Sequence, residues 1–241
     1  MNTYLNLFKT KAEADAAVYD ENNTPNVSYC EEDESVKYTE KIVPAWMDMV
    51  DLGLPSGTLW AKANLGAESE TEYGKYFQWG DTVGYTDASH STWQTTPFNH
   101  GSGVFNNTYF IKVIDDVCPN KILAPQYDAA CQASNGVMRM PFKEEYRELI
   151  ANTTNTWTTI NGVNGYKFTS KSNPSKYIFI PAAGVAANGN ISSQGSFSCV
   201  WSSTIYNNYQ DSMRLYFSSD SVNVDNSGRN YGYSIRGVCS K

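Results

Sequence analysis

The sequence predicts a globular α+β protein with short strands, two short helices and long loops, preceded by a small N-terminal helix and hairpin. Three observations support this fold class. Of the 241 residues, 41% are hydrophobic and 18% are charged, which is the balance of a folded chain. Aromatic residues reach 14%, and Asn, Ser, Thr and Gly are frequent, which favours strands and loops. Helical periodicity is confined to a few short segments.

Residues 1–45 differ from the rest and are expected to form a separate assembly or attachment segment. Thr10–Glu13 has the pattern of a capping box and predicts a short helix, Lys11 to Tyr19. Asn26–Cys30 and Ser35–Thr39 alternate apolar and polar residues around an acidic run, which predicts a hairpin with a charged tip. A helix and one hairpin cannot bury a core alone. This segment must therefore pack on the main domain, on another copy or on a larger assembly.

The main domain, residues 46–241, begins with a predicted strand, a Pro-Ser-Gly turn and a second strand over Val50–Ala61. The aromatic, Gly-flanked segment Tyr73–Gly80 is typical of a chain packed in a core between loops. Residues 84–110 lack periodicity and predict a long loop. A first short helix is predicted over Pro125–Ala133.

A second helix is predicted after Pro141, because Pro at the first turn and acidic residues near the N-terminus both favour helix initiation. Its apolar stripe, expected in the core, consists of Phe142, Tyr146, Leu149 and Ile150. Its acidic residues are expected to be solvated on the surface: Glu144, Glu145 and Glu148.

From Asn161 onward the pattern is strand and turn. The predicted strands lie in Gly162–Ser170, Tyr177–Gly184, Cys199–Thr204, Ser212–Phe217, Ser221–Val224 and Tyr233–Val238.

Charge and composition exclude several function classes. The net charge of -7 repels phosphate backbones, so no nucleic-acid partner is expected. No window of about 18 apolar residues occurs, so no membrane insertion is expected. The N-terminus lacks the apolar region of a signal peptide, which predicts folding in the cytosol unless a cleaved segment preceded it.

The cysteines do not predict a metal site, and no cofactor is expected. Five cysteines occur without a CxxC pair, and there are only two His residues to help. Reduced, mostly buried thiols are the expectation, although Cys199 and Cys239 could lie on neighbouring strands.

Seven blocks occur in order along the main domain: Asp51–Ala61, Asn64–Ala67, Tyr73–Gly80, Met138–Pro141 with Glu145, Tyr146 and Leu149, Ile180–Gly184, Trp201–Thr204 and Ser234–Val238. This ordered set, spread over residues 49–239, resembles the Fibrobacter succinogenes major paralogous domain. The sequence departs from the family at Met138, where Trp is usual, and at Gly237, where Pro is usual. Both departures are expected to be changes in packing.

That family is similar to the formylglycine-generating-enzyme branch of C-type-lectin folds, which includes variable proteins of diversity-generating retroelements. The resemblance implies a C-type-lectin-like domain whose C-terminal stretch is mutagenised at adenines, so that Asn codons scatter into Tyr, Ser, Asp and others. Residues 204–233 contain 5 Asn, 5 Ser, 5 Tyr and 3 Asp. The apolar framework between them is Leu215, Phe217, Val222 and Val224.

The N-terminal block, with Ala14–Ala17 and Pro25–Tyr29, resembles the leader of tail-associated proteins from phages of gut bacteria. It implies a virion tail protein assembled in the host cytoplasm, with residues 1–45 contacting other tail proteins. Tail-tip adhesins of this kind imply a homotrimer, although no heptad supports a stalk.

The C-terminal segment has the Tyr, Ser and Asn mixture of an antibody-like binding surface. Its Tyr rings offer rigid contact area, and its Asn amides offer both donors and acceptors. The expected ligand is a host cell-surface protein or glycan. The candidate ligand-binding residues are Tyr206, Asn207, Asn208, Tyr209, Asp211, Asn223, Asp225, Asn226, Asn230 and Tyr231.

Two other function classes remain open at this point. One is a lectin-like binding module on the bacterial surface or secreted, although the calcium-dependent sugar motifs Glu-Pro-Asn and Trp-Asn-Asp are missing. The other is a formylglycine-generating-type enzyme. That enzyme needs paired cysteines close in sequence, and a Ser/His/Asp triad would need His90 or His100 from a loop without a distinctive context. We therefore expect a binding protein and no enzyme.

Overall fold

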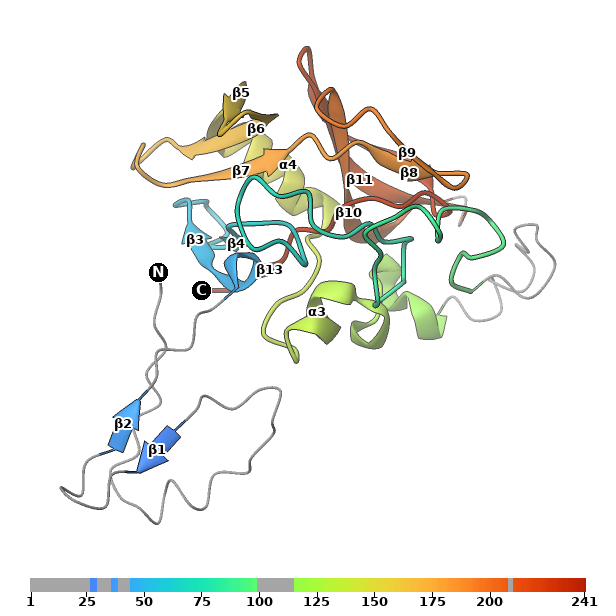
Figure 1. Cartoon of the computed structure of the whole chain (residues 1–241), viewed down its shortest axis with the longest axis horizontal. Helices are drawn as coiled ribbons and strands as arrows, with labels where there is room; N and C mark the ends of the chain where they lie inside the picture. Colours follow the sequence, from blue (N-terminus) through green and yellow to red (C-terminus); the bar gives the residue numbers. More distant parts are fainter. Residues whose placement is uncertain (1–26, 30–35, 39–43, 99–114, 208–209) are drawn as a thin grey trace. The chain divides into compact units, whose positions relative to one another are not determined.

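The structure is a computed structural model that describes residues 27–29, 36–38, 44–98, 115–207 and 210–241 (Figure 1). It divides into two compact units, Met1–Pro44 and Ala45–Lys241. In the first unit, β1 (Val27–Tyr29) and β2 (Val36–Tyr38) pair antiparallel, which confirms the predicted hairpin. The predicted helix Lys11 to Tyr19 and the acidic run lie outside the described residues.

The second unit is a mixed α+β structure of short antiparallel strands in small sheets, the class that the sequence predicts. Its first strands, β3 (Met49–Asp51) and β4 (Leu59–Ala61), form the predicted strand-turn-strand. They join the last strand, β13 (Val238–Cys239), in the order β13-β4-β3. The beginning and the end of this unit therefore lie side by side (Figure 1).

A second sheet contains β5 (Thr153–Ile160), β6 (Val163–Ser170) and β7 (Tyr177–Pro181) in sequential order. The sequence analysis predicted β6 and β7 but not β5, which is rich in Thr and has few apolar residues. Asn161 and Gly162 connect β5 to β6 with φ values of 49° and 81°. Two positive φ angles in succession make the tight turn that matches strand twist in a hairpin.

The third sheet, in the order β10-β11-β12, contains β10 (Phe197–Ile205), β11 (Asp211–Ser218) and β12 (Val222–Gly228), all three of which were predicted in part. A small hairpin of β8 (Val185–Ala187) and β9 (Asn190–Ser192), which was not predicted, precedes it.

The predicted strand Tyr233–Val238 is wrong for most of its length, because only Val238 belongs to a strand. The preceding residues make single bridges to three different partners: Gly232 to Ala186, Tyr233 to Phe77 and Ser234 to Val200. A segment that crosses between several partners cannot continue one ladder.

The described helices are short: η1 (Ala45–Met47), η2 (Pro119–Lys121), η3 (Pro125–Tyr127), α3 (Ala129–Ala133) and α4 (Lys143–Asn152). The predicted helix Pro125–Ala133 is interrupted at Asp128, whose backbone is extended and whose side chain accepts from the Cys131 N–H as an N-cap. Within the predicted long loop, the described residues 84–98 form turns and bends.

Helix α4 confirms the second predicted helix and lies against the inner faces of the sheets (Figure 1). Tyr146 and Leu149 are fully buried, while Phe142 and Ile150 at the ends of the stripe are half-buried. Tyr146, Leu149 and Ile150 belong to one core cluster, which also contains Phe168, Ile178, Leu215 and Phe217 from three different strands. Helix α4 therefore ties the second sheet to the third.

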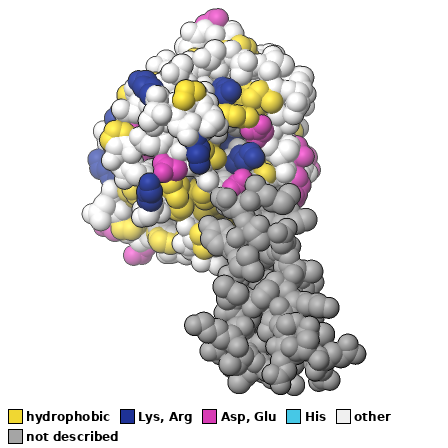
Figure 2. Space-filling model, turned by 90° about the vertical axis from the view of Figure 1, so that its left-hand side faces the viewer, with side chains coloured by type: hydrophobic (Ala, Val, Ile, Leu, Met, Phe, Trp, Pro, Cys, Tyr) yellow, Lys and Arg dark blue, Asp and Glu magenta, His cyan; other side chains and the backbone are white. Residues whose placement is uncertain are grey.

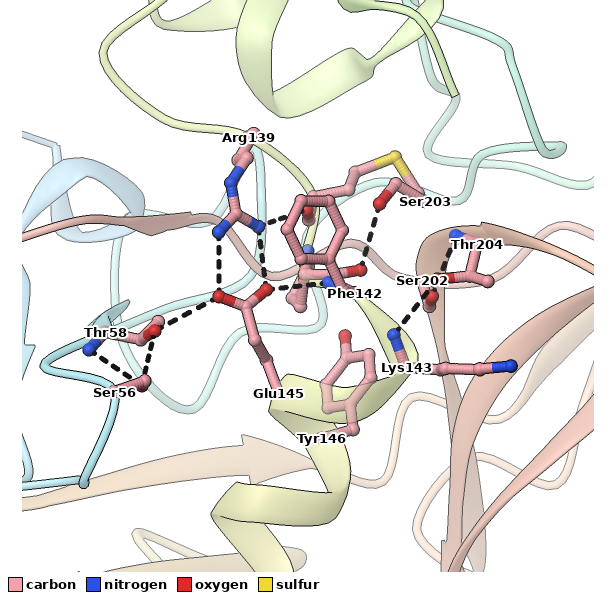
Figure 3. A network of polar contacts seen from close by, with 12 residues as sticks. Ser56, Thr58, Arg139, Phe142, Lys143, Glu145, Tyr146, Ser202, Ser203 and Thr204 are labelled. Carbon is pink, nitrogen blue, oxygen red and sulfur yellow. Dashed lines mark hydrogen bonds and ion pairs between the residues drawn. The ribbon is translucent and has the colours of Figure 1, made fainter. Parts of the chain in front are cut away.

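The expectation of a solvated Glu145 is wrong. Its side chain is buried and accepts from both Arg139 guanidinium nitrogens, Nη1 and Nη2, at 2.7 Å each (Figure 3). The same carboxylate accepts from the Phe142 backbone N–H at 2.7 Å and from the Thr58 hydroxyl at 3.1 Å. Helical position alone put Glu145 on a polar face, but the β3–β4 turn and Arg139 cover that face.

The other two acidic residues of α4 divide between structure and solvent. Glu148 is half-buried and accepts from the Ser56 N–H at 2.8 Å, so it also anchors the β3–β4 turn. Glu144 is exposed, as expected, and contacts Lys143 and Arg147 only at 3.6 and 3.9 Å.

We predict that Glu145→Gln lowers the free energy of unfolding by about 2–3 kcal/mol, because a neutral amide in this buried position cannot satisfy both guanidinium donors of Arg139 and no longer neutralises its charge. Glu144→Gln, one residue away and exposed, should change stability by less than about 0.5 kcal/mol. Urea denaturation followed by tryptophan fluorescence measures both variants. Equal effects at the two positions would contradict the role assigned to Glu145.

Candidate functional site

The third sheet has one face on the core and one partly open face. Along β11, Leu215 and Phe217 are fully buried in the core cluster that includes α4, whereas Arg214 and Tyr216 point to the opposite side and are half-buried. The residues opposite them in β12, Asp225 and Asn223, are exposed. We call the accessible side chains on this side the open face: Arg214, Tyr216, Asn223, Asp225 and Ser227.

The inner part of the same face is covered. Cys199 and Trp201 of β10 are fully buried, and the Tyr233 ring lies over Trp201 with 4.4 Å between centroids. The Trp201 indole N–H donates to the Phe77 carbonyl at 2.8 Å. The side chains that reach solvent on this face therefore come mainly from β11 and β12, with half-buried Phe197 at the start of β10.

Arg214 occupies the centre of the open face and connects its parts. Its Nε donates to Asp225 Oδ1 at 2.9 Å, and its Nη1 donates to the Tyr233 hydroxyl and to Cys199 Sγ at 2.8 Å each. Burial opposes the charge of Arg214, but nearby Cys199, Tyr233 and Asp225 favour it, so the pKa of the guanidinium is raised overall. The cation is thus permanent and already engaged.

Aromatic rings line up on both sides of this guanidinium. Its carbon lies 5.5 Å from the Tyr216 ring centroid and 5.3 Å from the Tyr233 centroid, within range of cation–π attraction. Tyr231 stacks on Tyr233 at 5.8 Å and 15°, and Phe197 lies 5.9 Å from Tyr216. We call these four rings the aromatic row: Phe197, Tyr216, Tyr233 and Tyr231.

The structure brings three of the predicted site residues together. Asn223 and Asp225 are exposed on the open face, and half-buried Tyr231 reaches the same cluster through its stack on Tyr233. Strand alternation puts Asp211 and Asn226 on the opposite side, where the Asn226 amide donates to the Asp211 carboxylate at 2.8 Å. These two residues fasten β11 to β12.

Other predicted residues lie elsewhere. Asn230 is only 7% exposed, so its side chain offers little surface to a ligand, contrary to the expectation. Its backbone carbonyl accepts from the Gln78 side-chain amide. Tyr206 is 37% exposed at the end of β10, and Asn207 beside it accepts from the Lys121 ammonium at 2.9 Å. Asn208 and Tyr209 lie outside the described residues.

Sequence reasoning did not select Arg214, Tyr216, Ser227 or Tyr233. A signal existed for the first two, because they alternate with Met213, Leu215 and Phe217 and so had to share the polar side of a strand. No local signal marks Tyr233, whose hydroxyl meets Arg214 from a separate segment and lies 2.7 Å from the Ser227 hydroxyl.

The four described cysteines, Cys118, Cys131, Cys199 and Cys239, are free. Burial raises the pKa of both Cys118 and Cys199 to about 12, so these thiols are held in the unreactive neutral form. Cys131 and Cys239 are half-buried. Within the described ranges, no group of three or more His, Cys, Asp or Glu side chains could hold a metal ion.

One pocket of about 190 Å³ lies apart from the open face, between the helical segment 119–131 and β10. Its walls are mostly apolar, and two charged residues line it, Asp128 and Arg139. Asp128 already accepts from the backbone of Cys131 and Met140, and Arg139 is bound to Glu145. The two charged side chains at this pocket therefore stabilise the fold through intramolecular contacts.

The surface elsewhere is mixed in character. On the side that Figure 1 draws at its left, Figure 2 shows basic and acidic side chains scattered among uncharged and hydrophobic ones. In the part of the chain that the structure describes, no helix is long and apolar enough to cross a membrane.

The comparisons with known proteins include a match to a protein family. Residues 146–238, from α4 to β13, match a family described as a domain of unknown function, DUF8237. This matched region contains the third sheet and the whole open face. Neither the curated proteins nor the solved structures yielded a match to this chain.

We predict that Arg214→Ala makes the Cys199 thiol more accessible to a labelling reagent. With a pKa of about 12, on the order of one Cys199 thiol in 10⁴ is ionised at about pH 8, and Arg214 and Tyr233 shield it. Iodoacetamide labelling of a Cys30→Ser background, read by mass spectrometry, should therefore be slow at Cys199. It should become several-fold faster in Arg214→Ala, because the gain in solvent access outweighs the loss of the Arg214 charge, which lowers the pKa of the thiol.

Cys118 is the internal control for that experiment, because it is equally buried and distant in sequence from Arg214. Faster labelling at both thiols would indicate general unfolding and would contradict a local role for Arg214. Both thiols should label readily in denaturant.

Proposed function

We propose that this chain is a receptor-binding adhesion protein whose ligand contacts the open face of the C-terminal sheet. The observation that carries the proposal is the combination of exposed, changeable side chains with a rigid base. Asn223 and Asp225 point into solvent, while Trp201 on the inner part of the same face and Leu215 on the opposite face are fully buried. A surface that is preorganised in this way loses little conformational entropy on binding.

The same arrangement suits a diversified surface. Side chains at Asn223 and Asp225 can change without disturbing the core, because both stand on the outer strand of the sheet. Leu215 and Phe217 face inward and must stay apolar. This division supports the proposal that the domain is C-type-lectin-like and varies under a diversity-generating retroelement, as the resemblance of residues 49–239 suggests.

We further propose that the protein is a phage tail-tip adhesin that recognises a host cell-surface protein or glycan. In this proposal residues 1–45 attach it to other virion tail proteins, and it assembles as a homotrimer in the host cytoplasm. A lectin-like binding module on the bacterial surface is the alternative. Tail genes beside the coding locus would favour the first reading over the second.

An enzyme of the formylglycine-generating type is not our proposal. The Cys199 thiol is buried, which raises its pKa to about 12, and Cys239 belongs to a different sheet. His90 stacks on Tyr85 at 3.7 Å between centroids and contacts Ser89, an arrangement that orders a surface loop. His100 lies outside the described residues.

We predict that Asn223→Arg abolishes binding to host cells, because a long cationic side chain in the middle of the open face blocks access. Asn190→Arg is the matched control, since Asn190 is also an exposed Asn on a strand and stands outside the open face. A cell pull-down with the labelled full chain measures both. Unchanged binding by Asn223→Arg would remove the open face from the proposal. Melting temperatures of both variants should stay close to that of the parent.

We also predict a pattern at the genetic locus. A reverse transcriptase gene and a near-repeat of the codons for residues 200–238 should lie nearby. Sequences from related isolates should differ at exposed positions such as 207, 223 and 225, and stay constant at Leu215 and Phe217. A locus with neither gene nor repeat, or variation spread evenly over the domain, would argue against diversification.

A further inference from the structure

We infer that the open face binds a neutral, hydroxyl-rich glycan through its aromatic row, without a metal ion. The inference rests on the proposed binding function and narrows its ligand class. It depends on three features of the described residues: ring placement, hydrogen-bonding groups and charge.

The aromatic row provides a platform for the apolar face of a sugar ring. Phe197, Tyr216 and Tyr231 are half-buried, so each ring is held in place by packing and still presents part of its surface. Tyr216 is fixed further by Arg214 on one side and Phe197 on the other. The electron-rich ring face attracts the positively polarised C–H groups of a pyranose, as it attracts other positive edges.

Polar side chains stand beside these rings and can bind hydroxyl groups. Asn223 is opposite Tyr216 in the strand register, and Asp225 is opposite Arg214. The amide supplies a donor and an acceptor, and the carboxylate, 47% exposed, supplies acceptors only. A ligand rich in hydroxyl donors with an apolar ring face satisfies both sets of groups.

Charge selects against acidic sugars. Arg214 is only 17% exposed at its side chain and already binds Asp225, so it is not offered to an anion. Asp220 and Asp225 lie at the exposed edge, and the whole chain carries a net charge of -7. An anionic glycan would therefore meet repulsion without a free cation to offset it.

The open face is poorly suited to a large protein partner. Protein interfaces depend on a few exposed aromatic or apolar anchors that become buried. The large hydrophobic side chains exposed in the described residues are Val83, Val137 and Tyr206, at 61%, 62% and 37%. Of these only Tyr206 lies next to the third sheet, directly after β10, whereas the rings of the open face are half-buried or buried.

Saturation-transfer NMR with the full chain and a panel of sugars tests the inference. The panel contains methyl glycosides of glucose, galactose, mannose, fucose and xylose, N-acetylglucosamine and N-acetylgalactosamine, with glucuronate and N-acetylneuraminate as acidic counterparts. At ligand concentrations up to about 20 mM, a dissociation constant in the millimolar range is detectable. We expect at least one neutral sugar to bind, no acidic sugar to bind, and EDTA to change nothing.

Variants locate the site. Tyr216→Ala should weaken binding of the neutral sugar about tenfold, and Tyr216→Phe, which keeps the ring, should retain most of it. Tyr177→Ala is the matched control, because Tyr177 is a half-buried strand tyrosine of the second sheet. Each variant is first checked for an unchanged melting profile, and Asn223→Arg, which should also abolish binding of the neutral sugar, carries the test if Tyr216→Ala is unstable.

The outcomes separate this inference from the proposed function. If no neutral sugar binds while Asn223→Arg still blocks cell binding, the ligand is a protein and only the glycan inference fails. Binding that needs a divalent cation, prefers an acidic sugar or survives Tyr216→Ala also overturns it. If a neutral sugar binds through Tyr216 but the open face is dispensable for cell attachment, the adhesion proposal fails instead.

Discussion

The carboxylate of Glu145 holds the second unit together at the point where its parts converge (Figure 3). It binds both Arg139 nitrogens, caps the first turn of α4 through the Phe142 N–H and accepts from Thr58 in the β3–β4 connection. Arg139 in turn bridges to Val238 of the last strand. A buried carboxylate in an ion pair stabilises the fold only when its remaining hydrogen-bonding sites are filled, as those of Glu145 are. The orientation of α4, and of the sheets packed on it, depends on this contact.

The open face follows from that orientation. Helix α4 covers the inner side of β11 and β12, so Leu215 and Phe217 are buried and their neighbours must point outward. On the outer side, Arg214 takes over the organising role by joining Asp225, Tyr233 and Cys199. Two arginine-centred networks, one inside and one at the surface, therefore fix a sheet whose outermost side chains are free to differ. Under the proposed binding function, that separation would let the ligand-contacting side chains change without loss of the fold.

Agreement between sequence and structure is best where the signal is local. Pro141 and the spacing of Tyr146 and Leu149 predicted α4, and the strand pattern predicted β6, β7, β10, β11 and β12 at least in part. Strand β5 was missed because it consists mostly of Thr and Asn and lacks a clear alternation of apolar and polar residues. The Asn161-Gly162 turn after it was a usable signal. Of the predicted binding residues, the structure gathers Asn223, Asp225 and Tyr231 in one cluster, and their role in binding stays a prediction.

The sequence by itself determined the α+β class, the position of α4, most of the strands and the polar character of the C-terminal segment, since these depend on periodicity and composition within short windows. Only the tertiary structure decided which polar residues are accessible. Glu145 and Asn230 are buried because segments far away in sequence cover them, and Tyr233 meets Arg214 because a bridging segment crosses the sheet. Local patterns specify the faces of an element, whereas burial on those faces is set by long-range packing.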